Sequence, residues 1–334
     1  MQQYNNKTIK QSFERFNKLN VLIIGDVMID AYMWGNVSRI SPEAPVPIVA
    51  VNKKENRLGG AANVALNVQA MGANPVLCSV IGNDDGGRVL FDLLKKQKLS
   101  AAGILKSNNR ITTVKTRVIG GNHQMLRVDE EIETDIDKKE TDSLILVIRR
   151  LITKKKVDVI IFEDYDKGVI TPQLINSIVA LARQKNIPTV VDPKKKNFMA
   201  YIGVTLFKPN LKELKEGLKL DFDHNNSKEL SKAVDGFIKK QKIDSALITL
   251  SEKGIYIHNA KTKTLIPAHI RNISDVSGAG DTVVSVAALC IALKLSPVLT
   301  ATLANLAGGL VCEKVGVVPI DKKQLLDEAV RLKL

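Results

Sequence analysis

Residues 21–26 read VLIIGD, an apolar run rich in β-favouring residues that ends in a glycine and an acid. The run is short and lacks the alternation of a half-exposed strand, so it predicts a strand buried on both faces. Similar runs recur: PVLCSVIG (75–82), VDVIIFED (157–164), IPTVVDP (187–193), VTLFKPN (204–210) and SALITL (245–250). Segments with helical spacing separate them, at 61–72, 86–97, 141–155, 171–185 and 227–241. This alternation predicts a doubly wound α/β fold, with a mostly parallel sheet flanked by helices.

Two segments interrupt the alternation. Residues 32–52 and 111–129 contain strand-like runs with no helical segment between them. Together they predict a small β-sheet lid beside the main sheet. No linker or low-complexity tract separates the lid from the rest, so we expect one large domain over 21–334 and an N-terminal extension over 1–20.

The composition excludes some classes of protein. Lys and Arg number 49 against 35 Asp and Glu, a formal charge of +14, but the lysines are scattered, as expected for a solvated surface. Attraction of small phosphorylated substrates is the alternative reading. Aromatic residues make up only 4% and no nucleic-acid recognition motif is present, so we expect no nucleic-acid partner. No apolar run is long enough to span a membrane, and three cysteines without a CxxC pair fit reduced thiols in the cytoplasm.

The segment DVSGAGDT (275–282) precedes a long apolar run. Gly278 and Gly280 allow backbone N–H groups to converge on one point, and the helix that follows adds its positive N-terminal dipole. Such a loop suits a phosphate or the charge that develops during its transfer. Asp281 would then lie beside the anion as a general base. The alternative is an ordinary glycine loop followed by an acid that merely favours the helix dipole.

A second glycine pair opens a helix at GGAANVALN (59–67). Its backbone could approach a hydroxylated ligand, with the Asn63 amide donating and accepting hydrogen bonds; a close-packed turn is the alternative. GDVMID (25–30) ends the first strand, at the edge where doubly wound sheets bind ligands. Asp26 or Asp30 could therefore hold sugar hydroxyls, unless both are merely solvated.

The segment PNLKE (209–213) places Asn210 and Glu213 three residues apart, just after a predicted strand. On a starting helix the two side chains share a side and suit Mg²⁺ binding through water. The same spacing is typical of an asparagine cap with a capping-box glutamate, and the residues alone leave both readings open. No histidine, cysteine and carboxylate cluster has the spacing of a structural zinc site.

Three of these motifs occur in one order: GGAAN, NxxE and DxxGAGD. In that order and spacing, over residues 20–320, the chain resembles the ribokinase-like (PfkB) sugar kinases. The resemblance implies ATP and Mg²⁺, with Asp281 as catalytic base and Gly278, Ala279 and Gly280 as the anion hole. It further implies a sugar site of Asp30, Gly59, Gly60 and Asn63, a nucleotide and Mg²⁺ site of Asn210 and Glu213, a nucleotide pocket lined by Thr249, Ser251, Gly254 and Asn305, and a monovalent cation such as K⁺ near Asp275.

A narrower resemblance is visible in GDVMIDAYMWGNVSRISPEAPVPIV (25–49), KTRVIGGNHQMLRVD (115–129), DYDKG (164–168) and VDPKKKNF (191–198). These segments are similar to the bacterial kinases that phosphorylate the anomeric hydroxyl of D-glycero-D-manno-heptose 7-phosphate, in the synthesis of ADP-heptose for lipopolysaccharide. The resemblance implies residues that hold the phosphorylated sugar, for which the candidates are Arg39, Lys115, Arg117, Arg127 and Asp164. The alternative for each of the four basic residues is an ordinary solvated surface position. It also implies that Lys194 approaches the transferred phosphate, if it is more than part of a solvated run.

Many relatives in that group carry a second, nucleotidyltransferase domain with an HxGH-type site. No HxGH occurs in this sequence, so we expect the kinase domain only. The chain departs from the usual pattern at Ser277, Glu163 and Lys208, and Lys208 bears on nucleotide preference. The rival hypotheses are another ribokinase-like kinase, for fructose, ribose or a nucleoside, and a basic binding protein without activity. Because lid strands expose edges that often pair, we expect a homodimer through the lid.

Overall fold

Apolar side chains alternate between two cores along β1 (Asn20–Gly25). Val21 and Ile23 belong to one core, Leu22 and Ile24 to the other, and all four are fully buried. The computed structural model describes residues 6–121 and 123–332, and every statement below refers to these. The strand is therefore buried on both faces, as its sequence predicts.

The main sheet has the order β13-β12-β11-β10-β9-β8-β1-β4-β5. Strand pairing is parallel from β5 through to β11, and the two strands at the other edge, β12 and β13, are antiparallel. The strands are β4 (Asn74–Gly82), β5 (Gly103–Ser107), β8 (Val159–Glu163), β9 (Thr189–Asp192), β10 (Leu206–Phe207), β11 (Ser245–Thr249), β12 (Ile255–Asn259) and β13 (Lys263–Ile266). The doubly wound, mostly parallel sheet is confirmed.

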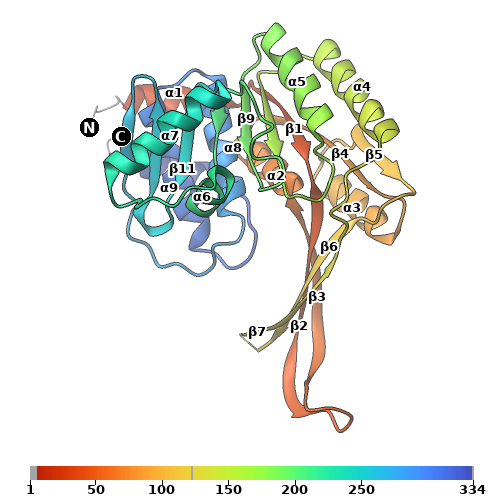
Figure 1. Ribbon diagram of the computed structural model, residues 1–334. Coiled ribbons are helices and arrows are strands. Elements are labelled where there is room, and N and C mark those ends of the chain that lie inside the picture. Colours follow the sequence, from red (N-terminus) through yellow and green to blue (C-terminus); the bar gives the residue numbers. More distant parts are fainter. Residues whose placement is uncertain (1–5, 122, 333–334) are drawn as a thin grey trace.

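Helices cover both faces of this sheet (Figure 1). One core receives side chains from α1 (Asn6–Phe16), α2 (Ala61–Ala70), α3 (Asp85–Lys96), α8 (Ala279–Ala292), α9 (Pro297–Cys312) and α10 (Lys322–Arg331). The other receives them from α4 (Lys138–Lys154), α5 (Pro172–Gln184), α6 (Leu211–Leu218) and α7 (Ser227–Gln241). α8 is buried almost throughout, which explains why its sequence is apolar on every side.

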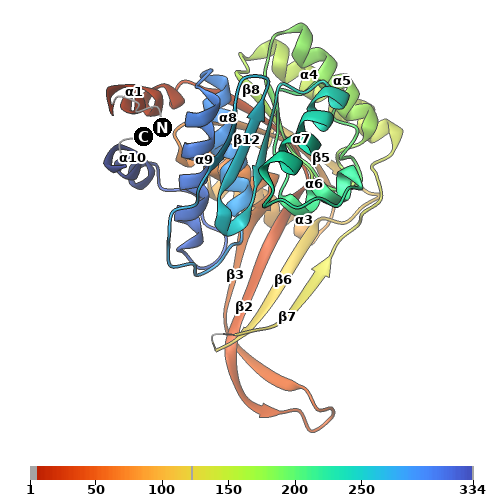
Figure 2. The ribbon, with the colours of Figure 1, turned by 60° about the vertical axis from the view of Figure 1, so that its left-hand side comes forward.

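A separate four-stranded sheet projects from the body (Figures 1 and 2). Its order is β3-β2-β6-β7, formed by β2 (Val27–Ile40), β3 (Pro47–Gly60), β6 (Thr113–Gly120) and β7 (His123–Glu130). The predicted lid segments, 32–52 and 111–129, lie mostly in these strands. Residues 41–46 connect β2 to β3 and residues 111–112 precede β6, while residue 122 lies outside the described residues. β2 begins two residues after β1 ends, so the lid sheet continues directly from the carboxyl edge of the main sheet.

The predicted N-terminal extension contains α1, whose side chains Ile9, Phe13 and Phe16 are buried in the first core. α1 packs beside α10, which brings the two ends of the described chain together. Residues 1–5 and 333–334 belong to the predicted ranges but lie outside the described residues. No helix in 6–121 or 123–332 is both long enough and apolar enough to cross a membrane. The three cysteines are buried free thiols.

Candidate active site

The glycine loop of residues 278–280 opens α8. Gly278 is the helix N-cap with φ 78°, a left-handed conformation that favours glycine, and no side chain caps the first turn. The first N–H groups of α8 therefore have no capping side-chain acceptor, and Asp281 lies in the same turn with 4% of its surface exposed. This is the local structure that the sequence predicts for an anion hole with an adjacent acid.

Asp281 is held by two hydrogen bonds from distant parts of the chain. The Asn63 Nδ2 donates to its Oδ2 at 2.6 Å, and the Tyr165 hydroxyl donates to its Oδ1 at 2.7 Å. Burial raises the pKa of Asp281 to about 6, although the two donors oppose that rise. The carboxylate is thus fixed in orientation and has a pKa close to neutrality, as a general base requires.

The α2 helix positions Asn63. Gly60 is its N-cap with φ 58°, so the second glycine pair turns the chain from β3 into the helix. One turn further on, Asn67 donates to the Asn63 backbone oxygen at 3.0 Å and accepts from the Thr282 hydroxyl at 3.1 Å. The N-terminal turns of α2 and α8 are therefore joined by side-chain hydrogen bonds, which brings the first and last predicted motifs to one place.

A buried ion pair lies behind the glycine loop. Lys208 Nζ is 2.8 Å from Asp192 Oδ2, and each side chain is almost fully buried. A β-carbon built on Gly280 would be 3.6 Å from both atoms, so the ammonium lies next to the loop. Burial lowers the pKa of Lys208, but the nearby carboxylates, Asp192 first and then Glu213 and Glu163, together outweigh burial, and the net pKa is raised. Lys208 is therefore a permanent positive charge beside the proposed anion hole.

Glu163 adds a third buried carboxyl group to this cluster. Its pKa is raised well above the ordinary value by burial first, and then by the charges of Asp192 and Asp281. Glu163 Oε2 and Asp192 Oδ1 are buried without a hydrogen-bond partner among the described residues. The cluster thus retains two acceptor atoms available to a bound water or ligand.

Asn210 and Glu213 form a capping box at the start of α6. Asn210 Oδ1 accepts from the Glu213 N–H at 2.8 Å, and Glu213 Oε2 accepts from the Asn210 N–H at 2.9 Å. The second Glu213 oxygen pairs with Lys194. Of the two readings of this spacing, the structure shows the cap directly, and both Glu213 oxygens are occupied. Any Mg²⁺ here would be held through water, since no three acidic, histidine or cysteine side chains among the described residues form a metal site.

Lys194 connects this cap to the acid. Its ammonium lies 5.4 Å from the centre of the Tyr165 ring, whose hydroxyl bonds Asp281. Burial lowers the pKa of Lys194, but the nearby carboxylates, Asp192 first and then Glu213, together raise it by more. The pKa of Lys194 therefore lies above its ordinary value. Lys194 faces the acidic cluster, whereas Lys196, two residues along, pairs with Asp135 and is partly exposed.

The other predicted nucleotide residues surround the ends of β11 and β13. Thr249 ends β11 and forms a bridge with Asn210. Ser251 and Gly254, with φ 52° and 96°, belong to the turn between β11 and β12. Asn305, on α9, donates to the Pro267 backbone oxygen at 2.8 Å. Asn210, Thr249, Ser251 and Gly254 thus lie at one edge of the sheet. Asn305 faces the segment after β13.

Asp30 is the predicted sugar ligand at the base of the lid. Its Oδ1 is 2.6 Å from Arg117 Nη1, and both side chains are largely buried. A β-carbon on Gly59 would lie 2.2 Å from the Asp30 Oδ2, so only glycine fits there. Lys115 pairs with Asp129 on β7 and with Glu131, which directly follows that strand. The structure therefore brings Asp30, Gly59, Lys115 and Arg117 together.

Three other candidates lie elsewhere. Arg39 is exposed at the distal end of β2, opposite Ile48, and Arg127 is half-exposed on β7 beside Asp129. Asp164 is buried, and its carboxylate accepts from the Asp166 N–H, the Asn197 amide and the Tyr201 hydroxyl. Burial, followed by the charge of Asp26, raises its pKa to about 7. These partners fix Asp164 in its loop, and its role as a sugar ligand stays a prediction.

The residues alone did not single out three side chains that build this site: Tyr165, Asp192 and Arg57. Asp26 is neither solvated nor free for a sugar, because its carboxylate accepts the N–H groups of Tyr165, Lys167 and Val169 at 2.9 to 3.2 Å. Arg57 donates to the Val317 backbone oxygen at 3.2 Å and so joins the lid to the body. Tyr165 lies in DYDKG (164–168), one of the segments that carry the narrower resemblance, and that segment is the sequence signal that could have pointed to it.

The Asp275 carboxylate, the predicted cation site, ties two loops together. It accepts from the Ser277 and Gly316 N–H groups, each at 2.9 Å. Burial raises its pKa, but these donors outweigh burial and the net pKa is lowered. Asp275 is thus charged at neutral pH, with both oxygens already accepting one hydrogen bond.

Comparisons with known proteins agree with this geometry. The pfkB family carbohydrate kinase model matches residues 18–323. The chain belongs to the PfkB family of carbohydrate kinases. It is 40% identical over 303 residues to the bifunctional protein HldE of Caulobacter sp. (strain K31), covering 90% of this chain and 61% of that protein. It is also 40% identical over 299 residues to HldE of Aliarcobacter butzleri (strain RM4018), covering 90% and 62%. The chain thus spans less than two thirds of these relatives' length.

Among solved structures, phosphofructokinase-2 from Escherichia coli in complex with potassium superposes with a TM-score of 0.76 at 15% identity, covering 95% of this chain and 99% of that one. This likeness confirms the ribokinase-like fold and says nothing of substrate. The prediction of a sugar kinase is confirmed at the level of the family, which implies ATP and a divalent metal ion.

Proposed function

We propose that the chain transfers the γ-phosphoryl group of ATP to the anomeric hydroxyl of D-glycero-D-manno-heptose 7-phosphate, giving the 1,7-bisphosphate. The observation that carries the reaction type is Asp281, a buried carboxylate with a pKa of about 6 in the first turn of an uncapped helix. The sugar is chosen on the resemblance of residues 25–49, 115–129 and 191–198 to heptose 7-phosphate kinases, and the similarity to HldE proteins supports it.

In this proposal the γ-phosphoryl group lies over residues 278–280. Asp281 accepts the proton of the anomeric hydroxyl as the new O–P bond forms, and the bond from the γ-phosphorus to the bridging oxygen breaks to release ADP. The N–H groups of the α8 first turn and the Lys208 ammonium face the charge on the transferred group. A bound Mg²⁺ supplies further neutralisation of the phosphates; Asn210 and Glu213 would hold its water ligands.

In this proposal the lid supplies the positive charge that neutralises the 7-phosphate of the sugar. Arg117, held by Asp30, and Lys115, held by two acids, are positioned before any sugar binds. Their existing partners explain how cations remain fixed on a thin sheet. We place the sugar between Asp30 and Asn63, with its 7-phosphate toward Lys115 and Arg117. Closure of the lid would exclude water, the competing acceptor.

A panel of acceptors with coupled ADP detection tests the function. Heptose 7-phosphate should have a kcat/KM at least tenfold above those of fructose 6-phosphate, fructose, ribose and adenosine. ADP release that is independent of any sugar measures hydrolysis and is subtracted. A preference for a neutral sugar or a nucleoside would assign the chain to another branch of the family.

We also propose that two copies pair through the lid. Six large apolar side chains are exposed on its strands, at Val37, Ile40, Val51, Met125, Leu126 and Val128, and strands β3 and β7 have unpaired edges among the described residues. Light scattering should give twice the chain mass, and Leu126→Asp with Val128→Asp should halve it. A wild-type mass of one chain would contradict the dimer.

A monovalent cation near Asp275 is proposed on the family resemblance, and the lowered pKa of Asp275 supports it. Replacing K⁺ by Na⁺ or tetramethylammonium at equal ionic strength should lower kcat. Equal rates in all three salts would remove the cation from the mechanism.

A further inference from the structure

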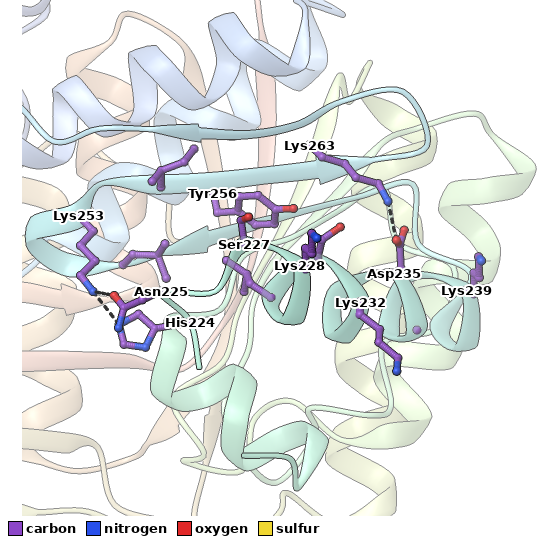
Figure 3. Close-up of a pocket in the computed structure, with 15 residues that line it drawn as sticks. His224, Asn225, Ser227, Lys228, Lys232, Asp235, Lys239, Lys253, Tyr256 and Lys263 are labelled. Atoms are coloured by element: carbon purple, nitrogen blue, oxygen red, sulfur yellow. Dashed lines mark hydrogen bonds and ion pairs between the residues drawn. The ribbon is translucent and has the colours of Figure 1, made fainter. Parts of the chain in front are cut away.

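A cavity of about 890 Å³ lies away from the glycine loops, between α7 and the hairpin of β12 and β13 (Figure 3). Leu230, Leu250, Tyr256 and Leu265 provide an apolar lining. The volume is that of a typical small-molecule site. None of these four side chains has a role in the proposed kinase reaction.

The rim of the cavity is strongly basic. Five lysines line it against one acid, Asp235: Lys228, Lys232 and Lys239 from α7, Lys253 from the turn after β11, and Lys263 from β13. Lys263 pairs with Asp235, while Lys228, Lys232 and Lys239 form no ion pair with a described residue. Three like charges along one helix repel one another, so an anion bound there would relieve this repulsion.

The lysines occupy both ends of the cavity (Figure 3). Lys253 lies at one end beside His224 and Asn225, and Lys263, Lys232 and Lys239 lie toward the other. Tyr256 and Lys228 lie between the two groups. This arrangement suits a ligand with an apolar or aromatic body and more than one anionic group.

Gly236 is a second, independent feature of this wall. It lies inside α7, where glycine disfavours the helix relative to alanine, and it lines the cavity. A β-carbon built on it would meet no atom within 4 Å. No neighbouring atom therefore requires glycine at position 236. The absence of a side chain there leaves the cavity wall open near the middle of α7, the helix that carries three of the lysines.

Asp235, the one acid that lines the cavity, also contacts the buried side chain of His258. His258 Nε2 is 2.8 Å from Asp235 Oδ1, and its Nδ1 is 3.1 Å from the Tyr256 hydroxyl. Burial lowers the pKa of His258, although Asp235 opposes this. The single acid of the cavity is therefore engaged by His258 and Lys263, which leaves it little capacity to neutralise the other lysines.

We propose that this cavity is a binding site for a small organic polyanion with an apolar or aromatic body, separate from the active site. α7 covers β12 from one face of the main sheet and α9, which carries Asn305, covers it from the other. The sheet thus lies between the cavity and that nucleotide residue. The two sites adjoin at the turn after β11, because Leu250 and Lys253 line the cavity and Ser251 and Gly254 form the same turn.

Fluorescence anisotropy of hydroxypyrene trisulfonate, a planar aromatic polyanion, tests the site on the full chain. One probe should bind per chain in the presence of saturating ATP, which occupies the active site. Lys232→Glu with Lys239→Glu should weaken binding at least tenfold. The matched control is Lys240→Glu with Lys242→Glu, exposed lysines at the same end of α7 that do not line the cavity, with the same change in net charge.

Gly236→Leu provides a variant that changes no charge. Leucine favours the helix and its side chain would fill the cavity, so the melting temperature should not fall while probe binding is lost. The proposal is overturned if ATP displaces the probe, if both lysine pairs weaken binding equally, or if Gly236→Leu binds as the wild type does. Absence of probe binding to the wild type would also overturn it.

Discussion

The floor of the active site and the lid hold their charges in different ways. On the floor, Asp281, Asp192 and Lys208 are almost fully buried, and each is held by a partner from another segment of the body. On the lid, Lys115 and Arg127 share Asp129, on neighbouring strands of a sheet that projects into solvent. Both sets of charges are therefore positioned before substrates bind, but those of the floor lie inside the body, whereas those of the lid lie on a projecting sheet. Substitutions should affect chemistry and folding on the floor, and KM on the lid.

The largest effect is expected from Asp281→Asn. Without a base, turnover should fall by roughly 10²–10⁴-fold, while the affinity for ATP changes little. Single-turnover kinetics and calorimetric titration with ATP measure the two quantities. Asp327→Asn, an exposed acid on α10, controls for the loss of one charge. Unchanged turnover in Asp281→Asn would remove Asp281 from the role of base.

Lys208→Met should have the next largest effect, on stability as well as rate. It leaves Asp192 and Glu163 buried without their cation, and breaking a buried pair from one side destabilises by about 3–5 kcal/mol. Urea unfolding measures the loss. The double variant with Asp192→Asn should recover part of the stability but not the rate. If it recovers both, the ammonium serves only to neutralise Asp192.

These buried charges are where the sequence was least informative. The apolar runs at 21–26 and 157–164 predicted central strands correctly, because continuous burial leaves a continuous apolar signature. Lys208, Asp192 and Glu163 have no such signature, since a charged residue is solvated far more often than it is buried. Asn210 and Glu213 show a different limit: one spacing supports both a helix cap and a metal site, and the structure shows the cap, while the metal role stays a prediction.

The pH dependence of catalysis should change with Tyr165→Phe. Since Asp281 must be ionised to act as base, kcat should fall as the pH drops through about 6. The Tyr165 hydroxyl stabilises the carboxylate and so lowers its pKa. Removing it should raise that pKa and move the acidic limb of the kcat profile to higher pH. A profile that keeps its midpoint would show that another group controls the limb.

The smallest effects should come from the lid. There, loss of the largely buried Arg117 should raise KM more than loss of the half-exposed Arg127. Arg117→Met removes a largely buried partner of Asp30, and we expect the KM for the sugar phosphate to rise about 10- to 100-fold with little change in kcat. Arg127→Met removes a half-exposed side chain and should raise KM by no more than about fivefold. Both changes should diminish for the same sugar without its phosphate, because the cations act on that group. An equal rise for both sugars would place the lid cations on the sugar hydroxyls or on the fold of the lid.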